Sequence, residues 1–123
     1  VADFKVVEKK NLKIKKKNEL TIKLEKNIDI LNYVSNHNSM RPKLVIGFAA
    51  ETNNLENNAI EKLKNKNCDM IIANDVSKQN IGFDSDFNEV TIFYRDNRKE
   101  KLFAKNKSLI SEEIVQRVNS QLN

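Results

Sequence analysis

The segment Lys43-Leu-Val-Ile-Gly-Phe-Ala-Ala-Glu-Thr-Asn-Asn54 decides the fold class of this chain. Its apolar run ends in a polar turn, and a charged stretch with helical spacing follows. A second apolar run, Met70-Ile-Ile-Ala73, ends in Asn74-Asp75. Two short apolar runs that flank a helical pattern predict a β-α-β unit with parallel strands. Ligands of open α/β sheets bind outside the carboxyl ends of such strands, so these two polar ends mark the expected site.

The flanking sequence predicts the other elements. Residues 1–7 resemble the end of a strand, and alternation at 12–14 and 20–24 predicts a basic β-hairpin arm. A helix from 28 to 34, capped by Asn27, and strand 44–50 are expected next. A helix from about 55 to a left-handed stop at Asn67 follows, and then strand 70–73 and a loop at 82–88. Strands 89–94 and 101–104 and a last helix that Ser108 caps complete the order. This order predicts a Rossmann-like α/β fold. We expect a mostly parallel sheet with helices on both faces and an antiparallel hairpin at its C-terminal side.

Length and composition fit a single globular domain or part of one. The chain has 123 residues, of which 39% are hydrophobic and 32% charged. It begins at Val1 without a methionine, so we expect a fragment, a processed chain or a trimmed one. No secretory signal heads the sequence, and no apolar run could cross a bilayer. Cys68 and His37, each the sole residue of its type, cannot form a disulfide or a zinc site, and a cytoplasmic location is expected.

The net charge of +5 raises the possibility of nucleic-acid binding. However, the chain has 18 Lys and 19 Asn but only four Arg, a composition that an AT-rich genome produces without selection for binding. Specific nucleic-acid readers use Arg for bidentate base contacts and aromatic side chains for stacking, and the lysine-rich stretch has neither. A basic nucleic-acid-binding module is therefore the less favoured alternative.

The residues that could carry chemistry are lysines and one aromatic side chain. Only Gly47 and Gly82 are glycines, which excludes a Walker A loop and a dinucleotide fingerprint from this stretch. Any phosphate must then be held by side chains or by a helix N-terminus. Lys62 and Lys66 lie one helical turn apart and share a helix face, which suits either a solvated surface or an anion site. Phe48 suits either a core position or a base-stacking one.

Several segments together resemble the phosphopantothenate–cysteine ligase family, which is usually the C-terminal part of a bifunctional coenzyme A biosynthesis flavoprotein in bacteria. The matching segments follow the family's order along the chain. They are Val1-Ala-Asp-Phe4, Lys13-Ile-Lys-Lys16, Glu19-Leu-Thr-Ile-Lys23, Lys26-Asn27 with Asp29-Ile30, Val45-Ile-Gly-Phe-Ala-Ala-Glu-Thr52, Ala73-Asn-Asp-Val76, and Gly82-Phe-x-Ser-Asp-x-Asn88.

The resemblance implies a reaction. Bacterial members activate the carboxylate of 4′-phosphopantothenate with CTP and Mg²⁺ to give an acyl-cytidylate and pyrophosphate, and the amine of cysteine then displaces CMP. Eukaryotic relatives use ATP, which is kept here as an alternative. FMN is expected only if a decarboxylase domain precedes the chain. The segments Phe48-Ala-Ala-Glu-Thr52 and Asn74-Asp-Val-Ser77 are close to the sequences of bacterial members, which favours CTP.

The resemblance also implies site residues. The CTP contacts would be Asp3, Lys13, Ile28, Asp29, Ile30, Leu31, Phe48, Lys62 and Lys66. Lys13, on the arm, would close over the triphosphate and act in catalysis, and no protein-held metal is expected. Many members have proline at the position of Ile28. A main-chain contact with the nucleotide would be retained in this chain, whereas a contact made by the proline ring would be lost.

The family's first third, which holds a glycine-rich nucleotide loop, has no counterpart in this sequence. Residues 1–123 would thus be the C-terminal portion of the ligase domain, weak or inactive alone. Family members are typically homodimers through this half, so the arm is a candidate dimerisation strand. A purely structural dimerisation fragment, which would bind no nucleotide, is a further alternative.

Overall fold

The computed structural model describes residues 2–8, 15, 21–77 and 85–123. The chain divides into two compact units, residues 1–30 and residues 31–123. Each unit is described by itself.

The first unit contains a short antiparallel pair of strands, β1 (Phe4–Val6) and β2 (Leu24–Lys26). Asn27 closes this pair, because its backbone N–H donates to the Asp3 carbonyl at 2.8 Å and its side chain donates to the Ala2 carbonyl at 2.7 Å. An arm with antiparallel strands is therefore present, but its described pairing joins residues 4–6 to 24–26. The expected strand at 12–14 and the expected turn lie outside the described residues.

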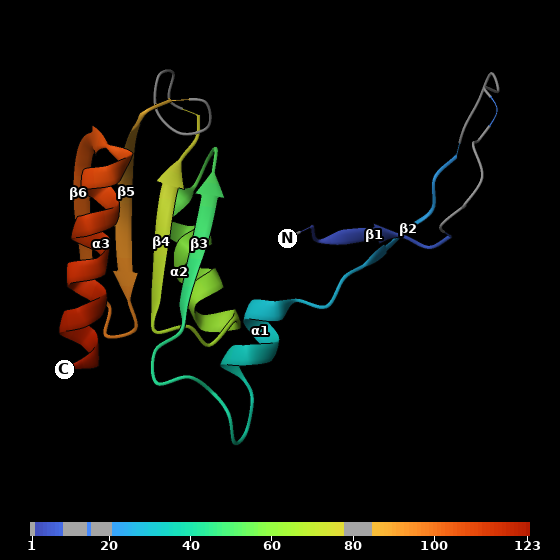
Figure 1. The fold of residues 1–123 in the computed structure, drawn as a ribbon, viewed down its shortest axis with the longest axis horizontal. Helices are drawn as coiled ribbons and strands as arrows, with labels where there is room; N and C mark the ends of the chain where they lie inside the picture. The colour runs from blue at the N-terminus through green and yellow to red at the C-terminus, as the bar shows by residue number, and fades with distance from the viewer. Residues whose placement is uncertain (1, 9–14, 16–20, 78–84) are drawn as a thin grey trace. The chain divides into compact units, whose positions relative to one another are not determined.

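The second unit is built on a sheet of four described strands in the order β3-β4-β5-β6 (Figure 1). Its elements are α1 (Ile30–Ser35), which begins at the unit boundary, β3 (Ile46–Glu51), α2 (Leu55–Asn65), β4 (Met70–Asp75), β5 (Phe87–Tyr94), β6 (Lys99–Asn106) and α3 (Lys107–Leu122). β3 and β4 are parallel, whereas β4–β5 and β5–β6 are antiparallel. The expected α/β class and the C-terminal antiparallel hairpin are confirmed. The sheet is mixed rather than mostly parallel, because β3–β4 is the one parallel pairing among its described strands.

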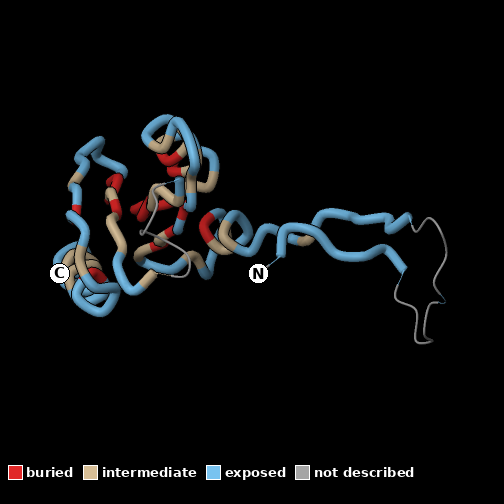
Figure 2. The backbone as a smooth tube through the Cα atoms, turned by 90° about the horizontal axis from the view of Figure 1, so that it is seen from above, coloured by how far each residue is buried: buried red, intermediate tan, exposed pale blue. Residues whose placement is uncertain are grey.

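Helices cover both faces of the sheet because successive strand residues point to opposite sides. Ile71 and Ala73 of β4 join a buried cluster with Ala59 and Leu63 of α2. Met70 and Ile72 join a second buried cluster with Ile110 of α3. Figure 2 shows the buried positions along the strands and the inner sides of these helices. Leu55, Ala59 and Leu63, at helical spacing, thus form the side of α2 that packs on the sheet.

Two helix starts differ from the sequence prediction. α1 begins at Ile30 rather than after Asn27, because the backbone and side chain of Asn27 hold the end of β1 instead. Asn106, not Ser108, caps α3, and its side chain accepts from the Ser108 N–H at 2.9 Å. Asn67 does stop α2, with a left-handed φ of 51°. Caps were therefore predicted in the right regions, but the side chain that accepts the free N–H was not always identified.

The apolar run predicted as strand 44–50 is fully buried on one face only. Val45 and Ala49 are buried against α2, whereas Phe48 is 66% exposed and Ala50 is also exposed. The reason is the position of α3, which packs mainly on β5 and β6, the strands farthest from β3. Ile46 still packs against the cluster on the α3 side, but this face of β3 is open at Phe48 and Ala50.

Candidate functional site

Lys62, on α2, reaches the outer edge of β3. Its Nζ donates to the Phe48 carbonyl at 2.7 Å. The Val45 and Glu51 carbonyls accept from Asp69 N (2.8 Å) and Val76 N (2.9 Å), on the β4 side. Since backbone groups alternate along a strand, the Phe48 carbonyl and N–H point away from β4. β3 is the last strand on that side of the described sheet, so Lys62 and the Phe48 backbone meet at an open edge.

The Lys62 ammonium keeps donor capacity at this edge. It has three N–H donors, one of which goes to the Phe48 carbonyl, a neutral acceptor. No carboxylate among the described residues forms an ion pair with it. An anion at the β3 edge would therefore find a half-buried cation that is oriented and not neutralised.

Lys66 is fixed by the junction between α1 and α2. The fully buried Ser35 hydroxyl donates to the Lys66 carbonyl. The Ser35 carbonyl in turn accepts from Arg41 Nε at 2.8 Å and from Asn67 Nδ2 at 3.0 Å. Lys66 N bonds the Lys62 carbonyl at 2.9 Å, which keeps the two lysines in helical register. The end of α1 thus anchors the end of α2 that carries both lysines.

Gly47 allows α1 to approach the same strand. A Cβ atom at this position would lie 2.6 Å from Ile71 Cδ1 and 3.0 Å from Leu31 Cδ2, both below ordinary contact distance. A side chain of any size would therefore push Leu31 away from β3. Because Gly47 precedes Phe48, this close approach sets Leu31 beside the edge at which Lys62 meets Phe48.

Of the residues expected to contact CTP, the structure brings Leu31, Phe48 and Lys62 together at β3, and Lys66 follows Lys62 by one turn. Asp3, Ile28, Asp29 and Ile30 are exposed residues of the first unit. Ile28 and Asp29 precede α1, and Ile30 is its first residue. Lys13 lies outside the described residues.

Polar groups that the sequence did not single out, with a partly buried carboxylate at their centre, hold this end of the molecule together. Asp69 accepts from Arg41 Nη2 at 2.8 Å and from Val45 N at 2.7 Å. Arg95 Nη2 lies 3.5 Å from the other Asp69 oxygen. Cys68, beside it, is 1% exposed, and burial raises the pKa of its thiol. The Asp69 network lacks a short sequence signature because its partners are distant in the chain.

A separate hollow of about 150 Å³ lies between α2 and the β5–β6 turn. Ile60, Leu63 and Phe93 are among its apolar lining residues, and Lys99 contributes a cation that pairs with Glu56 at 2.9 Å. None of the residues expected to contact CTP lines this hollow. Within the described ranges, no cluster of His, Cys, Asp or Glu could hold a metal ion. None of the described helices is both long enough and apolar enough to cross a membrane.

Fold and edge together define a Rossmann-like α/β domain in which a lysine ammonium meets the open edge of one strand. Residues 1–122 match the family described as the DNA/pantothenate metabolism flavoprotein C-terminal domain, and the chain belongs to this family. The resemblance to the ligase portion of the bifunctional coenzyme A biosynthesis protein is thereby confirmed.

The relatives agree in sequence and fold. The chain is 42% identical to the coenzyme A biosynthesis bifunctional protein CoaBC of Haemophilus influenzae over 96% of this chain and 29% of the relative. It is 47% identical to CoaBC of Escherichia coli (strain K12) over 80% of this chain and 25% of the relative. A crystal structure of a CoaBC C-terminal domain aligns with a TM-score of 0.67 at 35% identity, covering 82% of this chain and 45% of that one. The chain thus spans less than a third of the length of these curated relatives.

Proposed function

We propose that this chain supplies much of the nucleotide site of a phosphopantothenate–cysteine ligase that uses CTP. The observation that carries the proposal is the contact of Lys62 with the Phe48 carbonyl at the open edge of β3. Two residues expected to contact CTP, separate in sequence, meet there within hydrogen-bond distance. Family membership supplies the reaction class.

The proposed reaction has two steps. The carboxylate of 4′-phosphopantothenate attacks the α-phosphate of CTP, which forms an acyl-cytidylate and releases pyrophosphate. The cysteine amine then attacks the acyl carbon, forms the amide and releases CMP. An anion must approach a phosphate that is already negative, so oriented cations lower the barrier.

In this proposal, the Lys62 ammonium turns from the Phe48 carbonyl to a phosphate oxygen, and Lys66 adds positive charge from the next turn of the helix. A charge-assisted bond to phosphate is stronger than a bond to a neutral carbonyl, which favours the exchange. Lys13 would close over the triphosphate from the arm, and Asp3 and residues 28–31 would complete the nucleotide contacts. Leu31 belongs to this set and lies beside Gly47 of β3.

The remaining components are also proposals. Mg²⁺ would arrive with the nucleotide, held by its phosphates, since the described residues offer no metal cluster. FMN would belong to a preceding decarboxylase domain, if there is one. A homodimer through the arm, a cytoplasmic location and completion of the site by a preceding segment of the ligase domain follow the resemblance.

The test is pyrophosphate release from CTP with 4′-phosphopantothenate and cysteine, measured on the full-length natural protein. Lys62→Ala should lower kcat/KM by at least about tenfold, which corresponds to one lost charge-assisted bond. Lys64→Ala is the matched control, because Lys64 is an exposed lysine on the same helix that points away from β3. Equal rates for the two variants would contradict the proposed role of the edge. ATP in place of CTP tests the alternative nucleotide, and ligation by the isolated chain would refute its expected inactivity.

A further inference from the structure

Asn74, near the carboxyl end of β4, carries a buried acceptor without a donor. No solvent reaches its Oδ1, and no described donor bonds to it. A buried carbonyl without a hydrogen bond costs free energy, and nearly all such groups in native proteins are paired. The exception at this position calls for a donor that another molecule or the working state of the protein supplies.

Asn74 lies on the same face of the sheet as Phe48. Its neighbours two and four residues earlier, Ile72 and Met70, belong to the cluster on the α3 side, so strand alternation points Asn74 to the same face. In the parallel pairing, Phe48 is opposite Ile72 and Ala50 is opposite Asn74. Phe48 and Asn74 are therefore diagonal neighbours on one face, and Asn74 lies between Ala50 of β3 and Val90 of β5, its partner in the antiparallel pairing.

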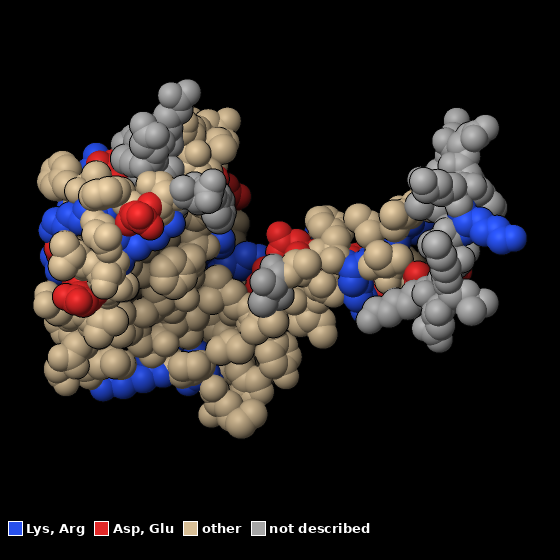
Figure 3. Space-filling model, turned by 45° about the horizontal axis from the view of Figure 1, so that its top comes forward, with Lys and Arg blue, Asp and Glu red and all other residues tan. Residues whose placement is uncertain are grey.

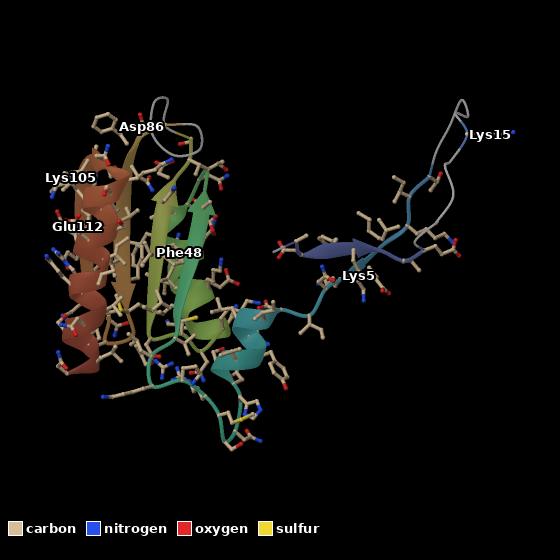
Figure 4. All side chains as sticks on the ribbon, in the orientation of Figure 1. Lys5, Lys15, Phe48, Asp86, Lys105 and Glu112 are labelled. Atoms are coloured by element: carbon tan, nitrogen blue, oxygen red, sulfur yellow. The ribbon has the colours of Figure 1, made fainter. Side chains whose placement is uncertain are left out.

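The β3 side chains next to Asn74 on this face are exposed. Phe48 is 66% exposed, and Ala50 next to it is exposed as well. Phe48 projects from β3 in Figure 4, and the face of this unit in Figure 3 has a broad uncharged area with Lys, Arg, Asp and Glu side chains around it. An exposed aromatic ring beside a small side chain suits a stacked base, because every base has a π-face.

We propose that Asn74 selects an amine-bearing base: a pyrimidine that stacks on Phe48 donates an exocyclic N–H to Asn74 Oδ1. The proposal rests on the nucleotide site proposed above and extends it from the phosphates to the base. Cytosine carries an amine at its C4 position, which can donate. Uracil carries a carbonyl oxygen there, which would face the Asn74 oxygen without a proton between them.

The geometry gives the amide a route to the ligand. In this proposal, the Asn74 amide rotates about its Cβ–Cγ bond and turns its oxygen toward the surface above Ala50. Lys62 holds the backbone at Phe48, on the phosphate side of the same strand. A nucleotide that crosses the β3 edge would thus place its phosphates at Lys62 and its base over Phe48 and Ala50.

The experiment is calorimetric titration of the full-length natural protein with Mg·CTP and with Mg·UTP. The wild type should bind CTP more tightly than UTP. Asn74→Leu, which keeps the size and removes the acceptor, should weaken CTP binding roughly 10- to 100-fold and leave UTP binding nearly unchanged. Because the leucine removes an unpaired buried oxygen, the melting temperature of the ligand-free variant should equal or exceed that of the wild type.

Each alternative outcome is decisive. A preference for CTP that persists in Asn74→Leu would overturn the role of Asn74 and leave the proposed function intact. A clear drop in the melting temperature of the variant would show that a protein group bonds the oxygen, which also overturns the inference. If the wild type binds neither nucleotide, the proposed function and this inference both fail.

Discussion

Replacing Gly47 with Ala tests the close approach that brings α1 to β3. The new methyl group would lie 2.6 Å from Ile71 Cδ1 and 3.0 Å from Leu31 Cδ2. Carbon atoms in contact are ordinarily about 3.5–4.0 Å apart, so both side chains must move by several tenths of an ångström or more. Ile71 is 0% exposed and has little free space into which to turn. We expect Gly47→Ala to lower the free energy of unfolding by about 1–3 kcal/mol, the usual range for overpacking.

Urea unfolding monitored by circular dichroism measures this change, and a double-mutant cycle identifies its cause. Ile71→Val removes the Cδ1 atom and alone should cost about 0.5–1.5 kcal/mol. In the Gly47→Ala background it should cost clearly less, because it also relieves the short contact, with a coupling of at least about 0.5 kcal/mol. Ala50→Val, which adds carbon on the exposed face of the same strand, should change stability by no more than about 0.5 kcal/mol. Additive costs for Gly47→Ala and Ile71→Val would refute the packing argument.

Three further predictions concern other parts of the second unit. Ser35→Ala removes a fully buried donor and should lower the free energy of unfolding by about 1–3 kcal/mol, whereas Ser111→Ala, at an exposed helical serine, should change it little. The Arg117 side chain, by hydrogen bonding, holds the pKa of Glu100 below its usual value. Their pairing therefore stabilises the fold above about pH 4.3, and this stabilisation is lost as the pH falls through the folded-state pKa of Glu100. In an acid titration, the free energy of unfolding of Glu100→Gln should fall less steeply with decreasing pH than that of the wild type, and an equal slope would exclude this pairing. Cys68, buried and with a raised thiol pKa, should react with a thiol reagent only on unfolding; rapid labelling of the native protein would contradict the described core.

The fold was predictable where local patterns decide it. The apolar runs at β3 and β4 and the stripe Leu55, Ala59 and Leu63 follow strand and helix periods, and they form these elements. What could not be predicted was which face each helix leaves open. The exposure of Phe48 depends on α3 covering β5 and β6 instead of β3, and no local pattern encodes that placement.

Candidate site residues divide in the same way. The spacing of Lys62 and Lys66 predicted a shared helix face, but their relation to Phe48 required the packing of α2 on β3. Asp69 and Ser35 escaped prediction because their partners lie far away in the sequence. Asn74 was recognised as part of a polar strand end, whereas its unpaired oxygen is a property of three-dimensional surroundings.

Calorimetric titration of CTP with Mg²⁺ tests the central claim, a nucleotide site at the edge where Lys62 meets Phe48, most directly. The wild type, Lys62→Ala and Lys64→Ala should be compared, with ATP as the competing nucleotide and Lys13→Ala as a probe of the arm. The account predicts CTP binding that weakens by at least about tenfold in Lys62→Ala and Lys13→Ala and is unchanged in Lys64→Ala. Titrating both the 123-residue chain and the full-length protein separates a site that needs a preceding segment from a wrong assignment. If Lys62→Ala leaves the affinity of the full-length protein for CTP unchanged, the account is contradicted.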